Sequence, residues 1–213
     1  MVGFPKSRFL FLAGLCHLVV VGLTGCGSNS FPFPFSGDDH NKMIVSVRDQ
    51  KMLLVRDGTP VKSYKISTSK FGIGDRPGSN CTPLGRLKVA KKIGDNAPIG
   101  SVFKTRRRTG EVIVPNAPGR DPVVTRIMWL TGTEPQNQNT FRRTIYIHGT
   151  PEERRLGSPA SYGCIRMGSR DVADLYNRIG TGADVFVIRG SIQSKKEEPS
   201  SAANEKIGGN PHG

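Results

Sequence analysis

Two short segments hold the residues best suited to covalent chemistry. One reads Tyr-Ile-His-Gly-Thr at positions 146–150, and the other reads Ala-Ser-Tyr-Gly-Cys-Ile-Arg-Met at positions 160–167. A cysteine becomes a strong nucleophile when a nearby imidazole removes its proton and the thiolate is stabilised. Cys164 and His148 are therefore the candidate nucleophile and base of an acyl-transfer site.

The other histidines favour this pairing. They lie at positions 17, 40 and 212, in stretches with the composition of a signal peptide, a linker and a tail, so His148 is the one that a fold would position. Gly163 suits the site because a residue without Cβ lets the backbone approach an acyl group and an oxyanion. Gly149 is expected to keep space open beside the imidazole. The same residues also fit a buried cysteine and a hydrogen-bonded histidine at a strand end, and spacing alone does not choose.

The elements that must position these residues are mostly short strands. Turn residues and alternating apolar positions predict strands at 43–47, 52–55, 61–66, 84–89, 123–130, 143–147 and 183–188. The stretch 94–121 is expected to be a long irregular loop, which in a small domain is often functional. One helix is predicted from residue 169, with Ser169 as its N-cap and Gly180 closing it. We expect one folded domain at 42–191, followed by a disordered polar tail at 192–213.

The N-terminus indicates export. Lys6 and Arg8 precede a short apolar stretch at 9–22, which is typical of a signal peptide and too short for a comfortable membrane span. The sequence Leu-Thr-Gly-Cys at 23–26 resembles a bacterial lipobox. We therefore expect residues 1–25 to be removed, Cys26 to carry a lipid and residues 26–41 to form a linker. An ordinary signal peptide followed by a chance cysteine is the alternative.

The residue after the lipid cysteine bears on the membrane. It is Gly27 rather than Asp, and resemblance to lipoprotein sorting in Gram-negative cells then implies the periplasmic face of the outer membrane. The expected location is the bacterial cell envelope.

The charge of the chain is strongly positive. There are 31 Lys and Arg against 17 Asp and Glu, a net charge of +14, and loss of residues 1–25 leaves 29 against 17, a net charge of +12. Such a surface attracts nucleic acid, anionic lipid or anionic wall polymer. Export argues against nucleic acid. The basic run at 104–108 lacks the interleaved aromatics of a nucleic-acid module and is expected to be a solvated loop.

The two chemical segments resemble the signature of the L,D-transpeptidase (YkuD-type) catalytic domain. That signature is a histidine, a short spacer, then Ser/Thr-His-Gly-Cys, an aliphatic residue and Arg or Asn. Here it reads His-Gly-Thr at 148–150, then Ser-Tyr-Gly-Cys-Ile-Arg at 161–166. Thr-Pro-Leu-Gly at 82–85 resembles the family's Thr-Pro-x-Gly segment, and 43–66 and 169–188 resemble its opening hairpins and its closing helix and strand.

The resemblance implies a mostly β fold, a mixed-sheet β-sandwich with one or two short helices. It also implies that Cys164 attacks the carbonyl between the third and fourth residues of a peptidoglycan tetrapeptide stem and releases D-alanine. The acyl group then passes to an amine of another stem as a 3-3 cross-link, to a lysine of an envelope protein, or to water. No metal or organic cofactor is implied.

Further roles follow from the same resemblance. His148 is the base, oriented by a backbone carbonyl near Gly149, and the amides of Gly163 and Cys164 are the oxyanion donors. Arg166 either contacts a substrate carboxylate or structures the site. Ser161 either hydrogen-bonds near the substrate or caps a turn.

Tyr162 departs from the pattern, because the family usually has histidine at that position. Tyrosine can donate a hydrogen bond but does not titrate near neutral pH, so we expect Tyr162 to bind or to shape the site.

The main alternative function is a catalytically weak, lipid-anchored peptidoglycan-binding protein. A thiol redox protein is disfavoured because Cys-x-x-Cys is absent. Cys81 is a second cysteine near the Thr-Pro segment, and a bridge from it to Cys164 under oxidation is a minor expectation.

Overall fold

The computed structural model describes residues 37–192. The predicted signal peptide, the lipid site Cys26, most of the linker and nearly all of the tail lie outside these residues. No helix among the described residues is long and apolar enough to cross a membrane.

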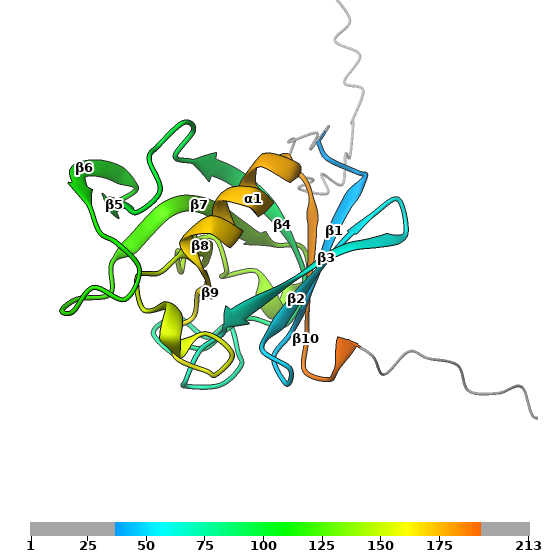
Figure 1. Ribbon diagram of the computed structural model, residues 1–213. Coiled ribbons are helices and arrows are strands. Elements are labelled where there is room, and N and C mark those ends of the chain that lie inside the picture. The colour runs from blue at the N-terminus through cyan, green and yellow to red at the C-terminus, as the bar shows by residue number, and fades with distance from the viewer. Residues whose placement is uncertain (1–36, 193–213) are drawn as a thin grey trace, which may run out of the picture. The chain divides into compact units, whose positions relative to one another are not determined.

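Strands dominate the described chain (Figure 1). In order, the elements are β1 (Asn41–Ser46), β2 (Lys51–Arg56), β3 (Thr59–Ser67), β4 (Gly85–Ile93), β5 (Ser101–Lys104), β6 (Arg107–Val112), β7 (Val123–Gly132), η1 (Pro135–Asn137), β8 (Tyr146–Gly149), η2 (Glu153–Arg155), β9 (Ile165–Met167), α1 (Ser169–Arg178) and β10 (Asp184–Ile188).

The strands form one mixed sheet that curves back on itself. Its order is β4-β10-β1-β2-β3-β9-β8-β7-β5-β6, and β4 pairs with β7 as well as with β10. The pairs β1–β10 and β8–β9 are parallel, and the other strand pairs are antiparallel. The expected mostly β fold, with a mixed sheet and one or two short helices, is confirmed.

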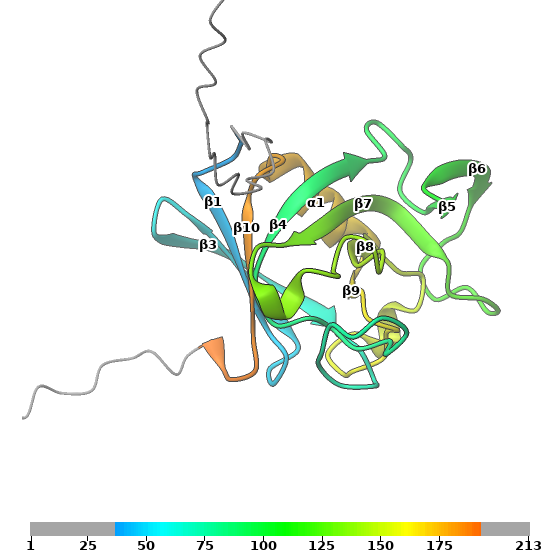
Figure 2. The ribbon, with the colours of Figure 1, turned by 180° about the vertical axis from the view of Figure 1, so that it is seen from behind.

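The main core is enclosed by the sheet and closed by α1. Alternate strand residues such as Met43 and Val45 are fully buried, and α1 contributes Val172, Leu175 and Tyr176 at helical spacing. Figures 1 and 2 show α1 beside β7 and β8, the strands that it contacts most. The helix therefore supports β8 from the core side.

A smaller apolar cluster lies on the other face of β7 and β8. It contains Ile127 and Tyr146, with the partly buried Trp129 and Cys164 packed against it. Because successive strand side chains point to opposite faces, Ile147 enters the main core while Tyr146 and His148 face the smaller cluster. This second face therefore carries the two candidate residues, His148 and Cys164.

Several predicted boundaries differ from the structure. The stretch 94–121 contains the hairpin β5–β6 rather than only loop, because β6 is Arg-rich and fully exposed and so lacks the apolar alternation that marks a strand. Strand β9 was missed because it has three residues, all buried. Strand β8 begins at Tyr146, since residues 142–144 form a turn.

The ends of α1 also differ. Gly168 is the N-cap, and the buried hydroxyl of Ser169 has no hydrogen-bond partner among the described residues; Glu153 accepts the Ser169 N–H instead. After the helix, the Gly180 N–H donates to Asp38, which lies in the predicted linker. The chain is thus packed against the domain a few residues before the expected start at 42.

Candidate active site

The nucleophile candidate lies at the start of β9. Pairing of Ile147 with Ile165 sets Cys164 beside Tyr146, and the Tyr146 N–H donates to Sγ at 3.4 Å. The thiol also lies 3.6 Å from the carbonyl oxygen of Thr144. Cys164 is half-buried and packs against the smaller apolar cluster.

The base candidate lies on the neighbouring strand. His148 is 6% exposed and pairs in register with Arg166. Because Arg166 is two residues after Cys164, the side chains of His148 and Cys164 occupy the same face of the sheet. Its Nδ1 is 2.8 Å from the carbonyl oxygen of Gly149. This acceptor assigns the proton to Nδ1 and leaves Nε2 free to take a proton.

Burial sets the protonation states of the pair. Desolvation lowers the pKa of His148 to about 4, against a weaker opposing hydrogen bond to Gly149. Desolvation raises the pKa of Cys164 to about 11, and the Tyr146 N–H and the Arg143 charge oppose this. At neutral pH the free protein therefore holds Cys164 as a thiol and His148 as a neutral imidazole.

Gly163 occupies a position that only glycine fits well. Its φ is +117°, and a Cβ there would lie 3.0 Å from Ile145 Cδ1 and 3.2 Å from the carbonyl oxygen of Cys81. Thr82 Oγ1 donates to the Gly163 carbonyl at 3.0 Å. The Thr-Pro segment is thus packed directly against the turn that precedes the nucleophile.

Ser161 shapes this turn. It is 2% exposed, its hydroxyl donates to the Cys164 carbonyl, and its Oγ accepts the Gly163 N–H at 3.2 Å. The Gly163 amide is therefore engaged, and it must exchange this partner to serve an oxyanion. The Cys164 N–H has no hydrogen-bond partner within residues 37–192, which leaves it available.

The space expected beside the imidazole at Gly149 is absent. A Cβ at this residue would lie 2.6 Å from the carbonyl oxygen of Val124 and 3.1 Å from Val172 Cγ1. The position beside the imidazole is closed by β7 and α1. Glycine is needed here for close packing, and its carbonyl orients His148.

Comparison with known families decides the classification. The model of the L,D-transpeptidase catalytic domain (YkuD) matches residues 40–188. The chain belongs to this family.

Solved L,D-transpeptidases share low identity with the chain. One from Mycobacterium tuberculosis H37Rv is 19% identical with a TM-score of 0.46, over 70% of this chain and 58% of that one. One from Xylanimonas cellulosilytica is 18% identical with a TM-score of 0.46, over 72% of this chain and 62% of that one. A mutant of the Enterococcus faecium enzyme is 18% identical with a TM-score of 0.46, over 71% of this chain and 50% of that one. The chain thus spans less than two thirds of the length of these structures. No protein of curated function matches the sequence.

Arg166, at the family's Arg/Asn position, is tied to acidic side chains of the domain. It is 4% exposed and pairs with Asp121 and, at 3.3 Å, with Glu152. Asp121 also accepts from the Thr150 hydroxyl. Arg166 therefore fastens the loop after β6 to the strand that carries the nucleophile. Its Nε and Nη2 are buried without a hydrogen-bond partner among the described residues.

Sequence reasoning missed a buried ion pair beside the nucleophile. Arg143 and Asp75 lie 2.9 Å apart, with side chains 7% and 4% exposed. Arg143 also donates to the carbonyl oxygens of Gly74 and, at 2.7 Å, Cys81. It thus holds the loop that packs on Gly163. The available signal was an arginine just before the strand that carries His148.

Tyr162 is exposed. Lys70 Nζ donates to its hydroxyl at 3.0 Å, and the centre of the Phe71 ring lies 5.2 Å from the centre of the Tyr162 ring.

Cys81 and Cys164 are both free thiols, and Cys81 Sγ faces the carbonyl oxygen of Phe71 at 3.2 Å.

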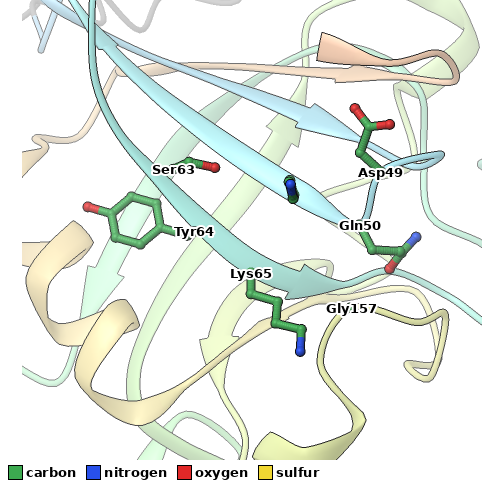
Figure 3. A pocket seen from close by; sticks show the side chains of 7 residues that line it. Asp49, Gln50, Ser63, Tyr64, Lys65 and Gly157 are labelled. Carbon is green, nitrogen blue, oxygen red and sulfur yellow. The ribbon is translucent and has the colours of Figure 1, made fainter. Parts of the chain in front are cut away.

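Two surface hollows do not have Cys164 among their lining residues. Figure 3 shows one between β2 and β3, with Asp49, Gln50, Lys65 and Gly157 around it. A second is lined by Pro77, Gly78, Asn139, Arg142 and Arg143. In the described part of the chain, no group of three His, Cys, Asp or Glu residues is placed to hold a metal ion.

Proposed function

We propose that this chain is a peptidoglycan L,D-transpeptidase with Cys164 as nucleophile and His148 as base. The observation that carries the proposal is the placement of both side chains on one face of the parallel pair β8–β9, with Nδ1 held by the Gly149 carbonyl. The family match over residues 40–188 supports it.

The first half-reaction forms a thioester. His148 Nε2 takes the proton of Cys164 Sγ, and Sγ attacks the carbonyl carbon of the third stem residue. The Cys164 N–H donates to the resulting oxyanion. When the intermediate collapses, the C–N bond breaks, the imidazolium gives its proton to the leaving nitrogen, and D-alanine departs.

The second half-reaction transfers the acyl group. An amine attacks the thioester carbon, His148 takes a proton from the nitrogen, the C–S bond breaks and the thiol is restored. An amine of another stem gives a 3-3 cross-link, and a lysine of an envelope protein gives protein attachment. Water gives the tripeptide acid, which is L,D-carboxypeptidase activity. No step uses a metal or an organic cofactor.

The proposed location is the bacterial cell envelope, with Cys26 carrying the lipid on the periplasmic face of the outer membrane. The lipobox-like residues 23–26 and the net charge of +12 after cleavage support a membrane-tethered protein that faces anionic wall polymer. Metabolic labelling with palmitate is expected in the wild type and not in a Cys26→Ser variant. Label retained in that variant contradicts the anchor.

A second candidate is a catalytically weak, lipid-anchored peptidoglycan-binding protein. The exposed Tyr162 in place of the family histidine, and a thiol whose pKa is raised to about 11, favour it.

The test incubates purified full-length protein with disaccharide-tetrapeptide and follows D-alanine loss and dimer formation by mass spectrometry. Cys164→Ala is expected to be inactive, and Cys81→Ser, which changes the other free cysteine within residues 37–192, is the matched control. Dimer from the wild type and Cys81→Ser, and none from Cys164→Ala, is the expected result. Tripeptide without dimer indicates a carboxypeptidase. No product, together with binding to sacculi, indicates the anchoring protein.

A further inference from the structure

The side chains of Lys70, Phe71 and Tyr162 form a small exposed cluster next to the turn that precedes Cys164. We call this cluster the Lys70 clamp. Lys70 Nζ lies 3.0 Å from the Tyr162 hydroxyl, 4.4 Å from the centre of the Tyr162 ring and 5.2 Å from that of the Phe71 ring. Phe71 is 48% exposed and Tyr162 is 63% exposed. The ammonium is thus held in one place by two aromatic rings that face solvent.

Backbone contacts fix the clamp relative to Cys164. Ser69 and Ser161 form a parallel bridge, and the Lys70 N–H donates to the Ser161 carbonyl at 3.1 Å. Tyr162 is two residues before Cys164, so their Cα atoms are at most about 7.6 Å apart. The clamp is therefore held on the same short turn as the thiol.

The clamp has free hydrogen-bond donors. The Tyr162 oxygen accepts from Lys70, so the phenolic hydrogen remains for another acceptor, and the ammonium has two further N–H groups. No carboxylate pairs with Lys70 in the part of the chain that the structure describes, so its charge is not neutralised there. A carboxylate accepts from both O–H and N⁺–H groups, and these charge-assisted bonds are stronger than neutral ones.

We propose that the Lys70 clamp binds the terminal carboxylate of the fourth residue of the stem peptide, and that Lys70 determines specificity for a free acid. The inference rests on the proposed function. In a tetrapeptide this carboxylate belongs to the residue directly after the carbonyl that Cys164 attacks, and the chain places Tyr162 two residues before Cys164. The Phe71 ring offers an apolar surface to the small side chain of that residue.

The test compares kcat/KM for disaccharide-tetrapeptide with that for the same peptide carrying a C-terminal carboxamide. The wild type is expected to prefer the acid by at least about tenfold. Lys70→Met is expected to lose this preference through a higher KM for the acid, with a much smaller change in kcat/KM for the amide. Tyr162→Phe keeps the ring and removes one donor, so it is expected to lose part of the preference. Lys42→Met, an exposed lysine on β1 with the same loss of charge, is the control.

Equal kcat/KM of the wild type for acid and amide overturns the clamp, as does an equal loss for both peptides in Lys70→Met. If the wild type turns over neither peptide, the transpeptidase proposal fails and the clamp is tested by calorimetry. Tighter binding of the acid to the wild type, and not to Lys70→Met, supports the clamp in that case, and equal binding overturns it. Displacement of acid and amide alike by inorganic phosphate identifies a phosphate site and also overturns it.

Discussion

The backbone N–H of Tyr146 donates to the sulfur of Cys164 at 3.4 Å. One short strand, β8, therefore supplies a hydrogen bond that favours the thiolate and, two residues later, the imidazole that we propose as the base. Because α1 and β7 pack closely around Gly149, this strand has little freedom to shift. The reactive pair is thus supported by the main core.

The thiol of Cys164 is expected to alkylate slowly at neutral pH. Its pKa is raised to about 11 by desolvation, so the thiolate fraction, and with it the rate with iodoacetamide, increases about tenfold per pH unit from 7 to 10. The measurement uses the Cys81→Ser protein, in which Cys164 is the free thiol within residues 37–192. A rate that is already constant above pH 7 indicates a preformed thiolate and contradicts this prediction.

The buried imidazole is expected to make folding depend on pH. The pKa of His148 is about 4 in the folded protein against 6.5 for the free side chain. Between these values the unfolded chain binds the proton and the folded chain does not, so the free energy of unfolding falls as the pH falls from 6.5 to 4. The loss approaches roughly 3 kcal/mol.

Urea unfolding at several pH values measures this loss. His148→Gln has no titrating group at this position, so the difference in unfolding free energy between wild type and variant should change over that pH range. A difference that stays constant from pH 7 to pH 4 shows that the imidazole titrates normally.

Gly163→Ala is expected to abolish most acyl transfer. The new Cβ meets Ile145 and the Cys81 carbonyl at a φ of +117°, so the turn before Cys164 must move. A displacement of about 1 Å at a reacting group costs on the order of a hundredfold in rate. Gly58→Ala is the matched control, since Gly58 also has a positive φ, +81°, but nothing within 4 Å of the added Cβ. Equal loss of transfer in both variants points to general instability instead.

Arg143→Met is expected to destabilise the fold and the site together. It leaves the Asp75 carboxylate, 4% exposed, without its charge partner, which typically costs about 3–5 kcal/mol. It also releases the Cys81 carbonyl and so the loop that packs on Gly163. Arg120→Met removes an exposed pair with Glu111, and less than about 1 kcal/mol is expected. Urea unfolding compares the two, and similar losses for both contradict the structural role of Arg143.

Tyr162→His is expected to retain transfer, while His148→Ala is expected to lose it. Tyr162 is exposed and its hydroxyl is bonded to Lys70, whereas His148 is buried and is the proposed base. The dimer assay with disaccharide-tetrapeptide measures both variants. Activity of His148→Ala equal to that of the wild type excludes His148 as the base.

The sequence by itself determined the features that depend on neighbouring residues. Apolar alternation marked most strands, helical spacing marked α1, and the segments around His148 and Cys164 identified the family. Each is a local property, because strand and helix periodicities are expressed within a few residues.

The tertiary structure alone decided which distant groups surround the nucleophile. Arg143 and Asp75 are 68 residues apart in sequence, and Lys70 and Tyr162 are 92 apart. Neither pair has a local pattern, since each depends on how the loop 70–82 folds over the turn at 161–164. The hairpin β5–β6 was also hidden, because its exposed, Arg-rich strand is stabilised by pairing with its neighbour rather than by burial. Periodicity reports only which residues are buried, so contacts made by exposed or paired polar groups emerge only when the chain is packed.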